Sequence, residues 1–333
     1  MRVPAPRITA TAIGAAMLLL AGCSSEKDGD DLQTIEPATA AVSPATATPA
    51  GTVQNLGRSI DALAFDPATG TTAILADGGT RLLLQREGGA EPRDVALDGK
   101  AAQVALAPEG RVLLPMDGRV QIVDTATGEK SSITVDGEAR SALFLADGNL
   151  AVGLANGRIL VVDASGAVSE TISGLASVDA LALTKGDLSA LDRRQTSLTE
   201  VEVDDDSLGM ALRAGEGATQ LVTDPHGRIL VTDTGGDELL VFTTDPLLMR
   251  QRFPVPDAPY GVAYDDRTDL VWVTVSGTNT VVGYDISTGI PVEKSRFGTV
   301  RQPNSVTVDT ASGTLLVGSA SGDGLQRIPL AAG

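Results

Sequence analysis

Short apolar runs separated by polar turns recur along the chain from about residue 53 to its end. Seven times, an apolar run is followed by turn residues, a second apolar run, a polar loop and a third apolar run. The first runs of these repeats end at Phe65, Leu106, Leu145, Leu183, Thr223, Tyr264 and Val308. A period near 40 residues with four strands per repeat is typical of propeller blades, so the pattern predicts strands throughout this region.

The residues around each first run indicate how the repeats pack. The turns that follow are rich in Asp, Pro and Gly, as in Asp66-Pro67 and Asp224-Pro225, which favours hairpin connections. Two residues before the end of each first run stands a large aliphatic residue: Leu63, Val104, Leu143, Leu181, Leu221, Val262 and Val306. The position before it is mostly small. Because alternate residues point to opposite faces of a strand, we expect a large face of each blade to pack on a small face of its neighbour.

These features predict an all-β fold over residues 53–333, a seven-bladed β-propeller with four antiparallel strands per blade. The chain ends soon after the third run of the seventh repeat, and residues 53–56 form a spare apolar run before the first. We therefore expect this N-terminal strand to close the last blade and remove its free edge. A six-bladed alternative would leave one repeat unassigned.

Two segments give the repeats a family resemblance. Residues 272–281, with the sequence WVTVSGTNTV, and residues 284–289, with the sequence YDISTG, resemble the YVTN repeat of surface-layer-type β-propellers. Asp192-Arg193-Arg194 in the fourth repeat departs from that pattern. The resemblance implies the propeller fold and leaves function open, because propellers host binding proteins and enzymes alike.

The first 22 residues have the layout of a secretory signal, with Arg2 and Arg7 followed by an apolar run and small residues. Leu20-Ala21-Gly22-Cys23 resembles the lipobox of bacterial lipoproteins, which implies cleavage before Cys23 and acylation of its thiol by chains such as palmitate. Cys23 is the only cysteine. The expected location is the extracytoplasmic face of a cell membrane. Residues 23–52 are rich in Ala, Thr and Pro and are expected to form a disordered tether.

The formal net charge of −18 excludes an extended basic footprint, so a nucleic-acid partner is not expected. The richness in Ala and Gly, together with more Arg than Lys, fits a high-GC genome such as that of an actinobacterium. Membrane contact is expected only through the lipid.

Catalytic motifs are scarce. The only histidine, His226, stands in an Asp-Pro-His-Gly turn, where a solvated loop residue is the simpler interpretation. Carboxylates are plentiful in the loops and could bind calcium, although Asp serves turn formation equally well. No other metal or cofactor is predicted.

The best candidate site is positional. Four residues before the end of each first run, at the channel mouth where the loops converge, stand Asp61, Ser141, Asp179, Thr219, Tyr260 and Asn304, with Ala102 in the second repeat. Propellers tend to bind small molecules or peptides at such clefts. The sequence therefore supports a non-catalytic binding or scaffold module for an envelope protein, peptide or glycan. The alternative is a calcium-dependent, lactonase-like hydrolase that uses channel carboxylates.

Overall fold

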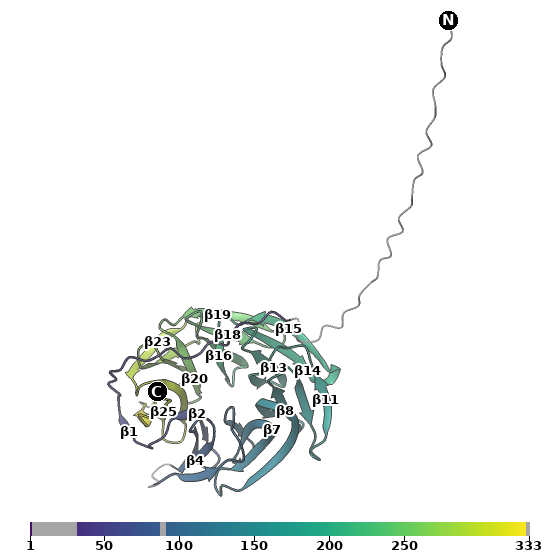
Figure 1. Ribbon diagram of the computed structural model, residues 1–333. Coiled ribbons are helices and arrows are strands. Elements are labelled where there is room, and N and C mark those ends of the chain that lie inside the picture. Colours follow the sequence, from purple (N-terminus) through teal and green to yellow (C-terminus); the bar gives the residue numbers. More distant parts are fainter. Residues whose placement is uncertain (2–31, 87–90, 331–333) are drawn as a thin grey trace.

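A computed structural model describes Met1, residues 32–86 and residues 91–330 of the 333-residue chain. These residues form 26 β-strands and one 3-10 helix, η2 (Val203–Asp205). The strands form sheets arranged radially around a central axis (Figure 1). The fold is an all-β propeller, as the repeat pattern predicts. Cys23 and the signal-like segment lie outside the described residues.

Five of the sheets have four strands each, and in each of them neighbouring strands pair antiparallel. They contain β2 (Ile60–Asp66), β3 (Thr71–Ala76), β4 (Arg81–Arg86) and β5 (Arg93–Ala96); β12 (Ala180–Thr184), β13 (Asp187–Asp192), β14 (Ser197–Glu202) and β15 (Ser207–Arg213); β16 (Ala218–Thr223), β17 (Arg228–Asp233), β18 (Glu238–Thr243) and β19 (Leu248–Pro254); β20 (Pro259–Asp265), β21 (Leu270–Val275), β22 (Thr280–Asp285) and β23 (Val292–Gly298); and β24 (Pro303–Asp309), β25 (Thr314–Ser319) and β26 (Leu325–Pro329) with β1 (Thr52–Gln54).

The sixth sheet has six strands and corrects the predicted count of seven blades to six. It contains β6 (Ala105–Ala107), β7 (Arg111–Asp124), β8 (Lys130–Phe144), β9 (Leu150–Leu154), β10 (Ile159–Val162) and β11 (Val168–Ile172). The physical cause is the length of β7 and β8. Each runs through two strand positions without a break, and a bulged pairing at Asp117 and Glu138 keeps them hydrogen-bonded together. The second and third sequence repeats therefore share one sheet.

The chain closes on itself as predicted. In β1, Thr52, Val53 and Gln54 pair antiparallel with Arg327, Gln326 and Leu325 of β26. The N-terminal strand thus becomes the outer strand of the last sheet. The pairing covers residues 52–54 rather than 53–56, and it joins the two ends of the propeller.

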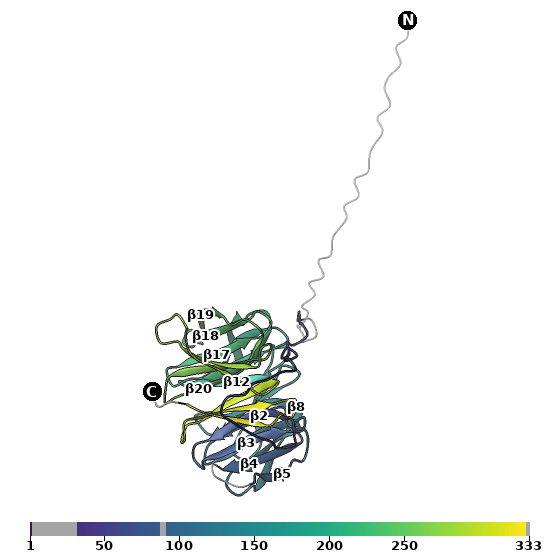
Figure 2. The same cartoon turned by 90° about the vertical axis from the view of Figure 1, so that its left-hand side faces the viewer.

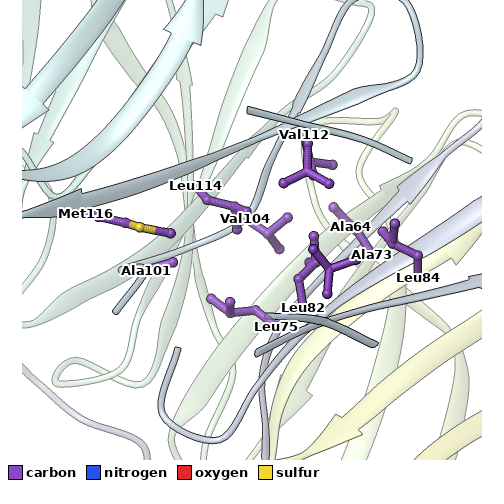
Figure 3. Close-up of a cluster of buried hydrophobic side chains, with 12 residues drawn as sticks. Ala64, Ala73, Leu75, Leu82, Leu84, Ala101, Val104, Val112, Leu114 and Met116 are labelled. Carbon is purple, nitrogen blue, oxygen red and sulfur yellow. The ribbon is translucent and has the colours of Figure 1, made fainter. Parts of the chain in front are cut away.

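The hydrophobic core lies between neighbouring sheets. Figure 3 shows one cluster, in which Leu75 and Leu82 of the first sheet meet Val112, Leu114 and Met116 of β7. All five side chains are at most 1% exposed. Burial of this kind stabilises the fold by about 25 cal/mol per Å² of apolar surface, so the contacts between sheets hold the ring together.

Residues 35–50, which we call the strap, belong to the segment that was expected to be a disordered tether. The structure corrects this expectation for the strap, which is docked on the propeller. The strap runs along the rim of the propeller in an irregular extended path (Figure 1). Its first backbone contact is from the Ile35 amide to the Arg194 carbonyl, at 2.7 Å, and its last is from the Ala50 amide to the Gly298 carbonyl, at 2.9 Å. Composition predicted disorder because the segment has few apolar side chains, but its backbone groups find hydrogen-bond partners in the loops.

Among the residues that the structure describes, no helix has the length and apolar composition needed to cross a bilayer.

Candidate functional site

An open cavity of about 1210 Å³ lies at the centre of the propeller. Its wall is built from the first strands of all seven sequence repeats: β2, β6, the second half of β8, β12, β16, β20 and β24. One opening, which we call the mouth, lies at the N-terminal ends of these inner strands. The opposite opening lies at their C-terminal ends. A cavity of this size can hold a small molecule or a short peptide.

The middle of the cavity has an aliphatic wall, formed by Leu63, Leu143, Leu181 and Leu221, which are all partly exposed. The large aliphatic residues of the inner strands also pack between sheets, as expected. Leu63, for example, joins the cluster between the last and first sheets, and Leu221 joins the cluster between the fourth and fifth repeats. These side chains thus serve the core and the cavity together.

Five of the six predicted mouth residues line the cavity: Asp61, Asp179, Thr219, Tyr260 and Asn304. Four of them share a feature that the sequence did not reveal. Asp61, Thr219, Tyr260 and Asn304 lie where the pairing between the first and second strands of their sheets is interrupted by a bulge or irregularity. Bulges often re-aim side chains next to functional sites, and here they occur around one opening.

The prediction for Ser141 is wrong. Its side chain is fully buried, and its Oγ donates a hydrogen bond to the Val178 carbonyl at 2.9 Å. Ser141 packs closely against Gly153, where an added Cβ would lie only 2.2 Å from Ser141 Oγ. The cause of the error is a one-residue shift in the third repeat, where β8 ends at Phe144 rather than Leu145. A shift of one residue moves a side chain to the other face of a strand.

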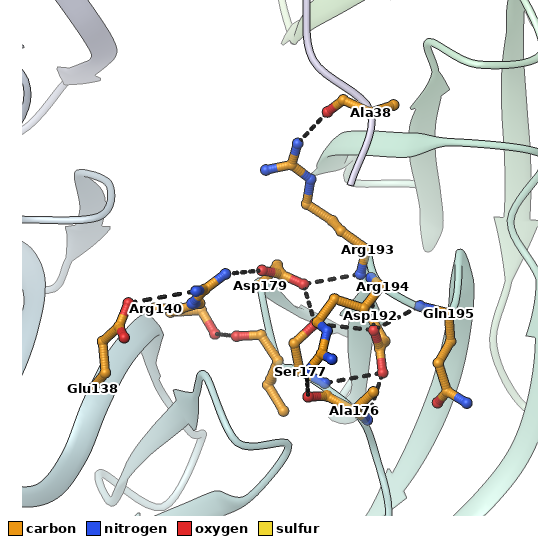
Figure 4. Close-up of polar contacts among 12 residues, drawn as sticks. Ala38, Glu138, Arg140, Ala176, Ser177, Asp179, Asp192, Arg193, Arg194 and Gln195 are labelled. Atoms are coloured by element: carbon orange, nitrogen blue, oxygen red, sulfur yellow. Dashed lines mark hydrogen bonds and ion pairs between the residues drawn. The ribbon is translucent and has the colours of Figure 1, made fainter. Parts of the chain in front are cut away.

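Arg140 is the residue that occupies this mouth position in the third repeat. It lies at the irregularity between Ala139 and Ser141 and lines the cavity. Its Nη1 donates to Asp179 Oδ1 at 3.0 Å, and its Nη2 lies 3.4 Å from Glu138 Oε1 (Figure 4). Strand alternation counted from Phe144 would have identified it.

Asp179 is the centre of a polar network at the mouth (Figure 4). Its side chain is only 6% exposed, and its Oδ2 accepts from Ser177 Oγ at 2.5 Å and from the Arg193 amide at 2.9 Å. The buried carboxylate of Asp192 accepts hydrogen bonds from the same loops, including one from the Ser177 amide at 3.0 Å. The segment Asp192-Arg193-Arg194, which departs from the repeat pattern, therefore forms part of one side of the mouth.

The mouth is chemically uneven. Its charged side chains come from the first four repeats and include Asp61, Lys100, Arg140, Asp179 and Arg193. Burial raises the pKa of Asp61 above its ordinary value, and the Gly79 amide, which donates to Asp61 Oδ2 at 2.9 Å, offsets this only in part.

The other side of the mouth is uncharged and comes from the last three repeats. Thr219 Oγ1 lies 2.7 Å from Thr234 Oγ1, and Asn304 Oδ1 accepts from Gln302 Nε2 at 3.2 Å. The half-buried Tyr260 adds an aromatic ring to this side. A bound molecule would meet charged groups on one side and neutral hydrogen-bonding and aromatic groups on the other.

The mouth carboxylates have protein partners. Asp61 accepts from a backbone amide, and Asp179 pairs with the Arg140 guanidinium. Within residues 32–86 and 91–330, no three His, Cys, Asp or Glu side chains are grouped closely enough to hold a metal ion. Loop carboxylates such as Asp233, which accepts from the Gly217 amide at 2.7 Å, serve turn formation.

His226 lies near the opposite opening. Its Nε2 is 3.4 Å from Asp269 Oδ1, and the same oxygen accepts a hydrogen bond from the Tyr264 hydroxyl at 2.9 Å. The pKa of Asp269 is lowered mainly by the hydrogen bond from Tyr264 and to a smaller extent by that from His226. The pKa of Tyr264 is raised mainly by burial and to a smaller extent by its hydrogen bond to Asp269. This group is separate from the predicted mouth residues.

No protein-family model and no curated protein sequence matches the chain. Solved structures match its fold. Virginiamycin B lyase from Staphylococcus aureus, in a catalytically inactive variant with quinupristin, is 13% identical with a TM-score of 0.71, over 84% of this chain and 99% of that one. Hydrazine synthase from Kuenenia stuttgartiensis is 14% identical with a TM-score of 0.71, over 85% and 99%. The β-propeller domain of Cps50 (Swd1) from Myceliophteria thermophila is 12% identical with a TM-score of 0.71, over 84% and 99%. At these identities the likeness shows the propeller fold alone.

Proposed function

We propose that this protein is a membrane-anchored extracytoplasmic lipoprotein whose propeller is a non-catalytic binding module of the cell envelope. The observation that carries the binding role is the central cavity, in which an aliphatic wall lies below a polar mouth. The lipobox-like residues that end at Cys23 carry the anchoring role.

The mouth favours a ligand with both apolar and polar groups. Apolar groups would enter the cavity against Leu181 and Leu221, where they would displace water from aliphatic surface. Polar groups would remain at the mouth, near Arg193 and Asn304. A peptide or glycan end, free or on an envelope protein, has this mixed character.

A binding role is preferred to hydrolysis because the carboxylates of Asp61 and Asp179 at the mouth already accept hydrogen bonds from protein groups. Asp179 is held by Arg140, Ser177 and the Arg193 backbone. A carboxylate that acts as a general base or holds calcium must offer free lone pairs to water, substrate or metal.

Peptide and glycan arrays probed with the chain from Ser24 onward test this function, followed by affinity measurements on the best ligand. We expect Tyr260→Ala and Arg193→Gln each to weaken binding at least about tenfold, since they remove an aromatic surface and a charged donor. Arg194→Gln is the matched control, because Arg194 is the exposed neighbour of Arg193.

Unchanged affinity in both mouth variants would refute binding at the mouth. Calcium-dependent hydrolysis of a lactone or ester panel, lost in Asp61→Ala, would replace the proposal with the hydrolase alternative.

A further inference from the structure

The strap lies on the same face of the propeller as the mouth. Ser43 Oγ donates to the Ser276 carbonyl at 2.8 Å, and Asn279 Nδ2 donates to the Pro44 carbonyl at 3.0 Å. Ser276 and Asn279 belong to the loop between β21 and β22, which lies at the mouth end of its sheet. In the side view of Figure 2, the strap follows one side of the propeller and the C-terminus lies toward the other.

The strap also reaches the mouth itself. Gln302 Nε2 donates to the Ala41 carbonyl at 2.7 Å and to Asn304 Oδ1, and Asn304 lines the cavity. Arg193 Nη2, from another cavity-lining residue, donates to the Ala38 carbonyl at 2.5 Å. The start of the strap is therefore fixed beside the mouth.

This fixed start shortens the connection to Cys23. Ile35 lies twelve positions after Cys23, compared with about thirty positions if the whole segment to residue 52 were free. Twelve residues reach at most about 40 Å, and a flexible chain of that length has a typical end-to-end distance of about 20 Å. Thirty residues would reach about 100 Å, enough to let the propeller turn over freely.

We infer that the strap orients the anchored protein so that the mouth of the cavity faces the membrane surface. This inference rests on the proposed lipid anchor at Cys23. β21 has six residues and spans about 20 Å, so the opposite face lies about that much farther from the start of the strap. A ligand of the mouth would then be a molecule presented within a few tens of ångströms of the bilayer.

Energy transfer on vesicles tests this orientation independently of acylation in cells. The chain from Ser24 would carry a hexahistidine tag in place of Cys23 and bind phosphatidylcholine vesicles that contain a Ni²⁺-chelating lipid and an acceptor-labelled lipid. The chain then has no native thiol. Donor dyes would be attached at Asn156→Cys and Thr278→Cys on the mouth face, and at Ser165→Cys and Ser287→Cys on the opposite face. All four positions are exposed. Asn156 and Ser165 form one pair at the two ends of β10, and Thr278 and Ser287 form the other at the two ends of β22.

We expect transfer efficiency to be at least about twofold higher at the mouth-face position of each pair, because of the difference of about 20 Å in distance. Inserting a flexible 30-residue Gly-Ser linker before Ser24 should make the two positions of a pair nearly equal, because the docked strap then no longer limits rotation.

Gly298→Ala is the second control. A Cβ there would lie 2.3 Å from the Thr48 carbonyl oxygen and 3.3 Å from its carbon, with nothing else within 4 Å. This contact holds only the end of the strap, so the variant should loosen that end while the start stays docked at Arg193, Arg194 and Gln302 and the transfer bias remains. Thermal unfolding checks that the fold is intact.

Equal transfer at both faces in the unmodified chain, or a bias that survives the linker, would overturn the inference. Neither result would affect mouth binding, and failure of acylation in cells would remove only the native anchor.

Discussion

Arg193 Nη2 donates a hydrogen bond to the backbone carbonyl of Ala38 at 2.5 Å, which joins residues separated by 155 positions in the chain. Arg193 lines the central cavity and Ala38 belongs to the strap, so the contact connects the candidate binding site to the N-terminal segment. Changes in the strap are therefore expected to affect both stability and the geometry of the mouth.

The strap should contribute to stability. A chain that starts at Gly51 loses the strap but keeps β1, and we expect it to unfold about 1–3 kcal/mol more easily than a chain that starts at Ile35. Several hydrogen bonds contribute about 1 kcal/mol each, and the entropy cost of ordering the strap offsets part of this gain. A chain that starts at Arg58 should be weaker still, because β1 is also missing. Chemical denaturation of the three chains measures this, and equal stability of the first two would show that the strap contributes nothing.

Gly153→Ala should destabilise the protein by about 2–3 kcal/mol, because overpacking of a tight core costs energy. Its Cβ would lie 2.2 Å from Ser141 Oγ and 2.3 Å from Val178 Cγ1. Ser141→Ala, which removes only one hydrogen bond, should cost about 1 kcal/mol. Thermal unfolding compares the two variants. Wild-type stability of Gly153→Ala would mean that the buried placement of Ser141 is incorrect.

Asp61→Asn should remove a contribution to stability that falls as pH rises, so the variant should gain more stability than the wild type with rising pH in the acidic range. Because burial raises the folded-state pKa of Asp61, the folded protein binds more protons than the unfolded chain between the unfolded and folded pKa values. Its contribution to stability is therefore present below the unfolded pKa, near 4, and is lost as pH rises through the folded value. Denaturation midpoints from pH 3 to pH 7 test this. If the wild-type protein gains more stability than Asp61→Asn as the pH rises through this range, the sign is wrong.

Calcium should matter little. Arg140 Nη1 lies 3.0 Å from Asp179 Oδ1, and its positive charge would repel a cation at that carboxylate. We therefore expect a chelator to shift the melting temperature by less than about 1 °C. Asp61→Ala should leave the fold intact. Differential scanning fluorimetry with and without chelator makes the comparison. A large drop that calcium reverses would favour the hydrolase alternative.

Membrane attachment should depend on Cys23. Cys23→Ser removes the thiol that would be acylated, and we expect the variant to leave the membrane fraction or to accumulate as an uncleaved precursor. Fractionation after a high-salt wash, with Ser24→Ala as the control, measures this. A processed Cys23→Ser protein that stays on the membrane would rule out the lipid anchor.

The sequence located most of the mouth because inner strands repeat at a regular spacing. Asp61, Thr219, Tyr260 and Asn304 occupy equivalent strand positions and meet at one opening. It failed at Ser141 because strand ends cannot be placed to one residue from composition alone, and with a period of two that error selects the wrong side chain. Arg140 was missed for the same reason.

Local patterning by itself determined the strands, their turns and the propeller class, because alternating apolar residues and turn residues act within a few positions of each other. The closure by β1 was predictable because a spare apolar run precedes the first repeat and the last repeat is one strand short. The tertiary structure alone decided three things: the merging of the second and third repeats through β7 and β8, the pairing of Arg140 with Asp179, and the docking of the strap. Each depends on hydrogen bonds between residues that only the folded backbone brings together. The strap is ordered because its carbonyls accept hydrogen bonds from distant side chains such as Arg193, Asn279 and Gln302. No local pattern reveals these partners, so composition alone predicted disorder.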